Sequence, residues 1–269
     1  MADVVLAVTH HDSDGRWMSP VAEHLPAALT LYAGAVAVCS RETPPEAMRQ
    51  LRSLGVLAQI DNHPGGPARL GEVRRRVLRL ALESGAAHIH FCDLDRALHW
   101  ATFHPEELRQ VVEEMPAWDF WVLGRTPRAF ASHPPDQTLT ESLANTVFGM
   151  ATGLTWDLLA ASRGISASAA RWLLAHSQEP TFGTDAEWPL LLRAAGGFRV
   201  GARECDGLSF ETADVYPQEV AAAGGRDAWR LQRSQSPQVW AQRLQYAAWV
   251  AQAVVETQRR WAEGSTSGK

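Results

Sequence analysis

Short apolar runs alternate with amphipathic stretches along the first 95 residues, and this alternation constrains the fold more than any other feature of the chain. The apolar runs cover residues 4–8, 35–39 and 56–60, and a fourth ends at Asp93. Between them lie helical patterns such as residues 71–84, where apolar side chains recur at helical spacing. Strands that alternate with helices favour a parallel sheet with right-handed crossovers. The sequence therefore predicts an α/β fold with a mostly parallel central sheet flanked by helices.

Polar residues follow each of these predicted strands. They occupy residues 9–12, 39–41, 61–69 and 93–96. The carboxyl ends of parallel strands meet at one edge of a sheet, and ligands in such folds bind just beyond that edge. We therefore expect the ligand site at these four strand exits.

The fourth strand exit carries the most specific chemistry, Asp93-Leu94-Asp95. Side chains at positions i and i+2 of a strand point the same way, so an extended backbone would aim both carboxylates into one small volume. Two such carboxylates repel each other unless a cation, a proton or a basic partner lies between them. Carboxylate oxygens suit Mg²⁺ or Mn²⁺, ions that also hold phosphate oxygens. The alternative is a solvated turn at the end of a strand.

The composition excludes several classes of protein. Of the 269 residues, 46% are hydrophobic and 20% are charged, which is ordinary for a globular domain, and the formal charge of −5 argues against a dedicated nucleic-acid binder. Three widely spaced cysteines are typical of a reduced, cytoplasmic protein. The chain opens without a signal-peptide pattern, and no apolar run reaches 18 residues, so we expect no membrane span.

The second half of the chain is less regular, and its last long pattern, residues 237–262, is helical. We expect one catalytic domain over residues 1–205, a helical extension over residues 206–263 packed on that domain, and a disordered tail over residues 264–269. The apolar side of the last helix could pair with a second subunit to form a homodimer, although the sequence leaves the oligomeric state open.

Four segments of the chain combine into a pattern typical of one group of enzymes. They are residues 8–12, residues 65–71, residues 91–95 and residues 183–200, the last of which begins Gly183-Thr184-Asp185. In order and spacing these segments resemble the glycosyltransferases of the GT-A fold, similar to the family 2 enzymes and their relatives. The resemblance implies an enzyme that moves a sugar from a nucleotide-diphosphate sugar to a hydroxyl acceptor, both of them small molecules.

By this resemblance, Asp93 and Asp95 would bind a divalent metal, Mg²⁺ or Mn²⁺, that grips the diphosphate of the donor. The resemblance also implies donor contacts at the strand exits. The expected residues are Thr9, Asp12, Ser40, Arg69, Asp93 and Leu94, with Arg74 as a weaker candidate for a phosphate contact. A solvated helix face is the alternative for both arginines.

The resemblance assigns the acceptor side mostly to the second half of the chain. Asp185 is the expected general base, although an Asp at this place could also be a helix N-cap. Residues 162–166 resemble the acceptor-side turn of the family. The expected acceptor contacts are Arg163, Gly164, Glu187, Trp100 and Trp188. Glu187 could instead pair with a local arginine, and core packing is the alternative for both tryptophans.

The chain departs from the family pattern in three places. Where the family has an acidic residue after its second strand, this chain reads Cys39-Ser40-Arg41, which leaves the nucleotide base open. Thr184-Asp185 replaces the family's Glu-Asp pair. No histidine follows residue 176 to act as a third metal ligand, so Glu211 is the acidic candidate, with a solvated loop carboxylate as the alternative. Inversion or retention at the anomeric carbon also stays open.

Two other functions compete with this interpretation. One is a degenerate GT-A protein that binds a nucleotide-sugar or a partner without turnover. The other is a phosphatase of the haloacid dehalogenase type, because residues 93–98 resemble its nucleophile loop, although the single lysine, Lys269, counts against it. His88 and His90 share a strand face without a third zinc ligand, which favours hydrogen-bonded core residues.

Overall fold

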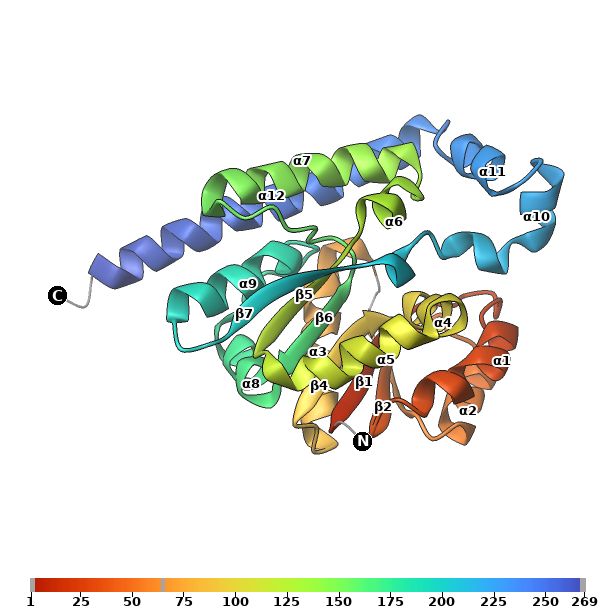
Figure 1. Cartoon of the computed structure of the whole chain (residues 1–269), viewed down its shortest axis with the longest axis horizontal. Helices are drawn as coiled ribbons and strands as arrows, with labels where there is room; N and C mark the ends of the chain where they lie inside the picture. The colour runs from red at the N-terminus through yellow and green to blue at the C-terminus, as the bar shows by residue number, and fades with distance from the viewer. Residues whose placement is uncertain (1–2, 64–65, 267–269) are drawn as a thin grey trace.

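The computed structural model describes residues 3–63 and 66–266, which form a seven-stranded sheet covered by helices on both faces (Figure 1). The strand order is β3-β2-β1-β4-β6-β5-β7. The strands are β1 Val4–His10, β2 Gly34–Ser40, β3 Leu57–Asp61, β4 His88–Asp93, β5 Phe120–Arg125, β6 Ser162–Ser166 and β7 Val200–Cys205. The predicted α/β class and the four predicted strands of the first half are confirmed.

The first four strands are parallel to one another, and β6 alone runs against its neighbours. β1 pairs with β2 and β4, β2 pairs with β3, and β5 pairs with β7, all in parallel. β6 is antiparallel to both β4 and β5. The expectation of a mostly parallel sheet is therefore confirmed. The acceptor-side turn expected at residues 162–166 is wrong, because these residues form β6 in the interior of the sheet.

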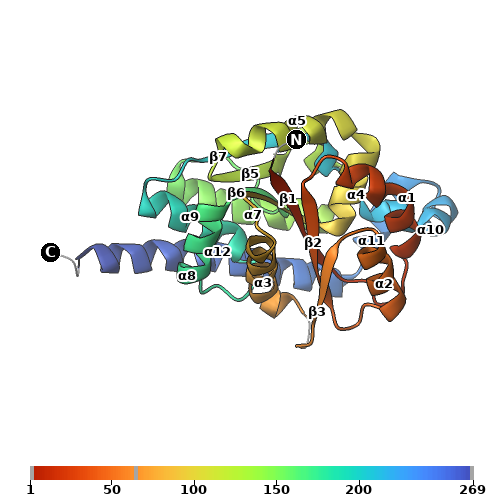
Figure 2. The same ribbon diagram turned by 90° about the horizontal axis from the view of Figure 1, so that it is seen from below.

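Side chains alternate between the two faces of the sheet, so a strand contributes side chains to two apolar cores. Along β1, Val4, Leu6 and Val8 lie in one core, whereas Val5 and Ala7 lie in the other. Helices cover the two faces separately (Figures 1 and 2). The first core is covered by α1 Met18–Leu29, α2 Pro45–Ser53, α4 Leu94–Phe103 and α5 Pro105–Glu114. The second is covered by α3 Leu70–Glu83, α8 Ala167–His176 and α9 Thr184–Ala195.

Two long helices, α7 Pro135–Thr152 and α12 Pro237–Thr266, run side by side along one end of the molecule (Figure 1). Arg243 lies 3.7 Å from Asp136 near their first turns, and the Gln258 amide donates to the Ala151 carbonyl at 2.9 Å near their ends. The two helices therefore run in the same direction. Residues 264–266, expected in a disordered tail, belong to α12, while residues 267–269, and Gly65 of the glycine-rich loop, lie outside the described residues.

The segment between β7 and α12 returns to the side of the sheet covered by α1 and α4 (Figure 1). Its elements are η3 Asp206–Leu208, η4 Thr212–Val215, α10 Pro217–Ala222 and α11 Arg226–Arg233. Three further short elements lie earlier in the chain: η1 Pro67–Arg69, η2 Met115–Ala117 and α6 Pro127–Ala131. The segment is fastened by His99 of α4, whose Nδ1 lies 2.6 Å from Oδ2 of Asp214. No helix in the described part of the chain is long and apolar enough to cross a membrane.

Candidate functional site

A cavity of about 860 Å³ opens at the carboxyl edge of the parallel strands, where the sequence predicts the ligand site. The exits of β1, β2, β3 and β4 all contribute to its wall. Its lining comprises Thr9, His10, His11, Ser13, Trp17, Val38, Ser40, Glu42, Asp61, His63, Gly66, Pro67, Leu70, Val73, Asp93, Leu94, Asp95, Phe182 and Gln242. Its volume lies in the usual range for a small-molecule or cofactor pocket.

Asp93 and Asp95 both line this cavity, but from different elements. Asp93 is the last residue of β4, and Asp95 lies in the first turn of α4. The expectation that both would project from one extended strand is therefore wrong, because the chain turns into a helix directly after Asp93. The Thr9 hydroxyl donates to Oδ1 of Asp93 at 2.5 Å, and the Arg96 backbone N–H donates to Oδ1 of Asp95 at 2.8 Å.

The surroundings of Asp93 and Asp95 disfavour the charged form of both carboxyl groups. Burial, together with the nearby charges of Glu211 and Asp93, raises the pKa of Asp95 to about 7. Burial also raises the pKa of Asp93, although Arg74 and the Thr9 hydroxyl oppose this shift. Such a pair gains stability from a bound cation, which fits Mg²⁺ or Mn²⁺. No group of three or more His, Cys, Asp or Glu side chains among the described residues is assembled to hold an ion.

Glu211 lies between β7 and η4 and is almost fully buried. Its Oε2 lies 3.7 Å from Nη1 of Arg96 and 3.8 Å from Nε2 of His133. Within the described part of the chain, each of these three atoms lacks a hydrogen-bond partner. Glu211 is thus not a solvated loop carboxylate. It is a buried charge close enough to Asp95 to raise the pKa of that residue.

Asp185 is buried at the start of α9 and is held by two arginines. Arg74 and Arg163 donate to the same oxygen, Oδ1, at 2.8 and 2.9 Å, and Arg74 also donates to the Thr184 hydroxyl at 2.7 Å. The N-cap position of α9 is Gly183, so the alternative that Asp185 caps the helix is wrong. Asp185 does not line the cavity, but its charge is close enough to raise the pKa of Asp93.

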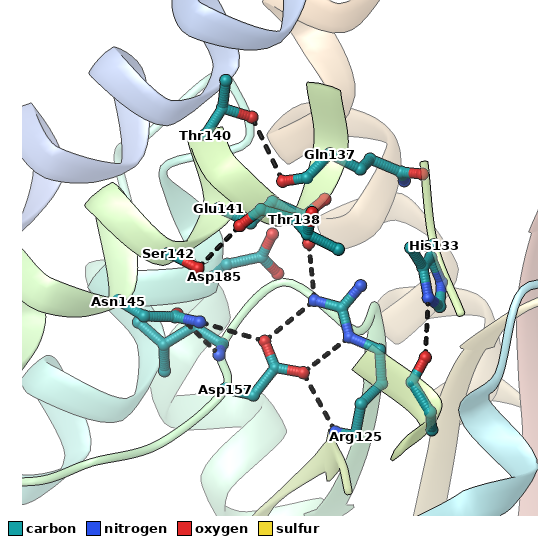
Figure 3. Close-up of polar contacts among 12 residues, drawn as sticks. Arg125, His133, Gln137, Thr138, Thr140, Glu141, Ser142, Asn145, Asp157 and Asp185 are labelled. Carbon is teal, nitrogen blue, oxygen red and sulfur yellow. Dashed lines mark hydrogen bonds and ion pairs between the residues drawn. The ribbon is translucent and has the colours of Figure 1, made fainter. Parts of the chain in front are cut away.

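A second buried ion cluster, centred on Arg125, was not predicted from the sequence. Arg125 ends β5, and its guanidinium binds Asp157 at 2.7 Å and Glu141 at 2.5 Å (Figure 3). Asn145 also donates to Asp157, at 3.1 Å. The cluster joins β5, α7 and the segment before β6. Both charged residues of α7 are buried, Glu141 in this cluster and Asp136 beside Ser234 and Arg243, and neither is free to interact with solvent.

Two expected phosphate contacts are engaged elsewhere. Arg69 pairs with Glu72 one turn further along the chain, with 3.0 Å from Nε to Oε2, and it does not line the cavity. Arg74 is buried with Asp185, so the alternative of a solvated helix face is wrong for Arg74. Among the other expected donor contacts, Thr9, Ser40 and Leu94 line the cavity. Asp12 lies outside the lining, and its Oδ2 accepts the Trp17 N–H at 3.3 Å.

Arg163 and Gly164, two of the expected acceptor contacts, lie within the sheet. Arg163 is buried and donates to the backbone carbonyl of Ser162 at 2.6 Å as well as to Asp185. Gly164 faces Met115, and a Cβ added at Gly164 would lie 2.7 Å from Cγ of that residue. Neither residue lines the cavity at the strand exits.

The remaining expected acceptor contacts are core residues. Trp100 is 0% exposed and donates its indole N–H to Glu107, while Trp188 is 2% exposed and donates to Ser177. The prediction that they stack on a sugar is therefore wrong, and the core alternative is confirmed. Glu187 is also fully buried and pairs with an arginine at 2.8 Å, but this is Arg260 of α12, 73 residues away along the chain, and not the local arginine that the alternative anticipated. His90 is likewise core, hydrogen-bonded to Tyr32 and Ser162.

Several cavity residues were not assigned individually from the sequence. Asp61 ends β3, and its position after an apolar strand was the available signal. Its Oδ1 accepts from Arg76 at 2.9 Å and lies 2.9 Å from Nδ1 of His63. Gln242 reaches the cavity from α12, more than 140 residues after β4, and no local pattern marks it.

Comparisons with known proteins place this geometry among solved folds. No protein-family model matches the sequence, and the search of curated proteins gives no match. Glucosyl-3-phosphoglycerate synthase from Mycobacterium tuberculosis, solved with Mn²⁺, uridine-diphosphate-glucose and phosphoglyceric acid, aligns with a TM-score of 0.51 at 12% identity, over 85% of this chain and 80% of that one. The crystal structure of a mycobacterial protein aligns with a TM-score of 0.50 at 13% identity, over 82% and 72%. This chain therefore has a GT-A fold.

Proposed function

We propose that this protein is a metal-dependent glycosyltransferase that moves a sugar from a nucleotide-diphosphate sugar to a hydroxyl acceptor. The observation that carries the proposal is the pair Asp93 and Asp95 on one cavity wall, at the carboxyl edge of a GT-A sheet. Their raised pKa values mark a place that favours a cation. The similar synthase was solved with Mn²⁺ and uridine-diphosphate-glucose, which supports the same classes of ligand here.

In this proposal, Asp93 and Asp95 hold Mg²⁺ or Mn²⁺ against the donor diphosphate. The bound ion would stabilise the negative charge that builds on the diphosphate as the glycosyl–phosphate bond breaks. Thr9 fixes the orientation of Asp93 through its hydrogen bond to Oδ1. Ser40 and Leu94 form the wall against the nucleotide, and Asp61 supplies from β3 the acidic group that is missing after β2.

Asp185 is the proposed general base. Both arginines bind its Oδ1, and no described residue is hydrogen-bonded to Oδ2, so that oxygen is the one able to take a proton. Asp185 does not line the cavity in this structure, so the start of α9 would have to shift to bring Oδ2 to the acceptor. The acceptor oxygen would then attack the anomeric carbon, the bond to the diphosphate would break, and the acceptor proton would pass to Oδ2. This arrangement corresponds to inversion at the anomeric carbon.

Glu211 is the proposed third carboxylate of the metal site. It is buried, its Oε2 lacks a hydrogen bond within the described residues, and its charge acts on Asp95. In this structure the carboxylate faces Arg96 and His133 instead. Joining the ion would therefore require a change of rotamer or a small shift of the segment that carries Glu211.

A thermal-shift assay tests the proposal. Mn²⁺ together with one class of nucleotide-sugar, drawn from uridine, guanosine and adenosine diphosphate sugars, should raise the melting temperature by several degrees at saturation. Asp93→Asn should abolish the shift. Asp227→Asn is the matched control, because its side chain is 91% exposed on α11. No stabilisation by any donor, with or without metal, would refute the proposal.

The second candidate is a degenerate GT-A protein that binds its ligand without turnover. The observation that favours it is the pair of arginines that holds Asp185 in the core. Donor stabilisation without transfer or donor hydrolysis would support this candidate. Phosphatase activity without nucleotide binding would instead support the haloacid dehalogenase alternative.

We also propose that the protein is cytoplasmic and forms a homodimer through α7 and α12. The three cysteines are free and buried, which suits a reducing compartment. Leu139, Leu143 and Met150 of α7 are 59–85% exposed, and no charged side chain lies on that face of α7. Leu244 and Val255 of α12 are 49% and 60% exposed. An uncharged apolar face of this kind is typical of an interface. Sedimentation velocity should give a dimer that Leu143→Glu converts to monomer; a monomeric wild type would refute this part.

A further inference from the structure

A second cavity, of about 380 Å³, adjoins the proposed donor cavity and shares two wall residues with it, Trp17 and Asp95. It lies between α1, α4 and the segment that carries α10 and α11, at the right of Figure 1. Its lining comprises Trp17, Pro20, His24, Asp95, Leu98, His99, Thr102, Phe103, Ala213, Asp214, Pro217, Val220, Ala221 and Arg226. A ligand here would be separated from the proposed diphosphate site by these two shared residues, Trp17 and Asp95.

The charges of this cavity compensate one another. Asp214 binds both Nδ1 of His99, at 2.6 Å, and the guanidinium of Arg226, at 2.5 Å. The Arg226 charge is thereby offset within the wall itself. Asp95 would be neutralised in turn by the metal of the proposed donor site. An anionic ligand therefore finds no unpaired arginine in this wall, and a cationic ligand finds no unpaired carboxylate.

The uncharged part of the wall offers ring faces and hydrogen-bonding groups. Phe103 is 54% exposed and lies against His99, with ring centroids 4.7 Å apart. Trp17 supplies a second ring from the loop before α1. Aromatic faces bind the C–H surfaces of a sugar ring, and oxygens accept from its hydroxyls. The acceptors in this wall are the carboxylates of Asp95 and Asp214 and the hydroxyl oxygen of Thr102, which itself donates to the Leu98 carbonyl at 2.7 Å.

We propose that this cavity binds the acceptor, and that the acceptor is a neutral sugar or polyol. The inference rests on the proposed glycosyltransferase function and adds to it the place and the chemical class of the second substrate. It also separates this protein from the similar synthase, which was solved with phosphoglyceric acid. The α10–α11 segment thereby gains a role, because it forms one side of the acceptor cavity.

Ligand-observed NMR on the full chain with Mg²⁺ tests the proposal without needing turnover. The probes are methyl α-glucoside, methyl α-mannoside, myo-inositol and glycerol, with 3-phosphoglycerate and glucose 6-phosphate as anionic counterparts. At least one neutral probe should bind, and Phe103→Ala should weaken it about five- to ten-fold. Leu57→Ala is the control, because Leu57 is exposed at the far end of β3 and should leave binding unchanged. Binding of the anionic probes alone, or no effect of Phe103→Ala, would overturn the proposal.

Asp214→Asn provides a second and opposite test. Removing this charge leaves Arg226 without its carboxylate partner, so the variant should bind 3-phosphoglycerate more tightly than the wild type does. Unchanged affinity for the anion in a variant that stays folded would show that Asp214 does not offset the charge of Arg226. Donor binding is measured separately by the thermal shift with Mn²⁺. A protein that binds a neutral sugar in this cavity but no nucleotide-sugar would refute the proposed function and leave the sugar site standing.

Discussion

The guanidinium of Arg74 lies 2.8 Å from Oδ1 of Asp185, and both side chains are almost fully buried. This contact joins α3 to α9 directly behind the strand that ends in Asp93. Arg74 also packs between two aromatic rings, those of Phe91 and Phe182, with its Cζ 5.7 and 5.6 Å from their centroids. Because its charge lowers the pKa of Asp93, Arg74 couples the buried pair to the proposed metal site.

Removing one member of this pair should be costly. Arg74→Met would leave Asp185 with Arg163 alone in the core, and breaking a buried ion pair typically costs about 3–5 kcal/mol of unfolding free energy. Arg49→Met is the control, because the Arg49–Glu46 pair is exposed on α2 and such pairs contribute about 0–1 kcal/mol. Urea denaturation of the two variants should separate them clearly. Equal stability would mean that the buried pair adds no more than a surface one.

Metal binding should depend on pH through Asp95. The pKa of Asp95 is raised to about 7, and a carboxylate must lose its proton to bind a metal ion. The apparent Mn²⁺ affinity should therefore fall about tenfold for each pH unit below 7 and level off above it. Calorimetric titrations at pH 5.5, 6.5 and 8 would measure this. A flat profile would contradict Asp95 as a ligand.

The pH dependence of Mn²⁺ affinity should change in the Glu211→Gln variant. Loss of the neighbouring charge should lower the pKa of Asp95, so the midpoint of the profile should move to lower pH. If Glu211 is also the third ligand, the affinity at pH 8 should fall as well. A shifted midpoint with an unchanged plateau would limit Glu211 to an electrostatic role.

The strand exits were predictable from the sequence because they depend on local patterns. Alternation of apolar runs and amphipathic helices places Thr9, Ser40 and Asp93 at the same edge before any contact is known. The partners of Asp185 lacked such a signal. Arg74 lies 111 residues away along the chain and Arg163 22 residues away, so only tertiary packing brings the three together.

The tryptophans were misassigned for a related reason. An indole in an apolar pattern can pack in the core or line a sugar site, and composition does not separate the two. For Trp100, the choice depends on a hydrogen bond to Glu107 and on the backbone of Gly207, which approaches the indole from another part of the chain. Proximity in sequence to Asp95 therefore did not imply proximity to the cavity.

Acid should destabilise the protein through His90. Burial lowers the pKa of His90 to about 3, whereas an unfolded histidine titrates near pH 6.5. Below pH 6.5 the unfolded chain binds a proton that the folded one does not, so the unfolding free energy should fall by up to about 1.4 kcal/mol per pH unit toward pH 3. His90→Gln should reduce this slope by about one proton.

Gly207 of η3 and Gly34 form a matched pair for testing how tightly the segment between β7 and α12 is packed against α4. A Cβ at Gly207 would collide with Cδ1 and Nε1 of the buried Trp100 ring, whereas a Cβ at Gly34 meets nothing within 4 Å. Because Trp100 is fully enclosed, the ring cannot move aside without opening the core, and overpacking of this kind costs about 1–3 kcal/mol or more. Gly207→Ala should therefore lower the melting temperature by several degrees and weaken ligand binding in the second cavity. Gly34→Ala should change stability little. If Gly207→Ala were as stable as the wild type, the segment would not be anchored on Trp100, and the acceptor cavity that it helps to form would lose its fixed wall.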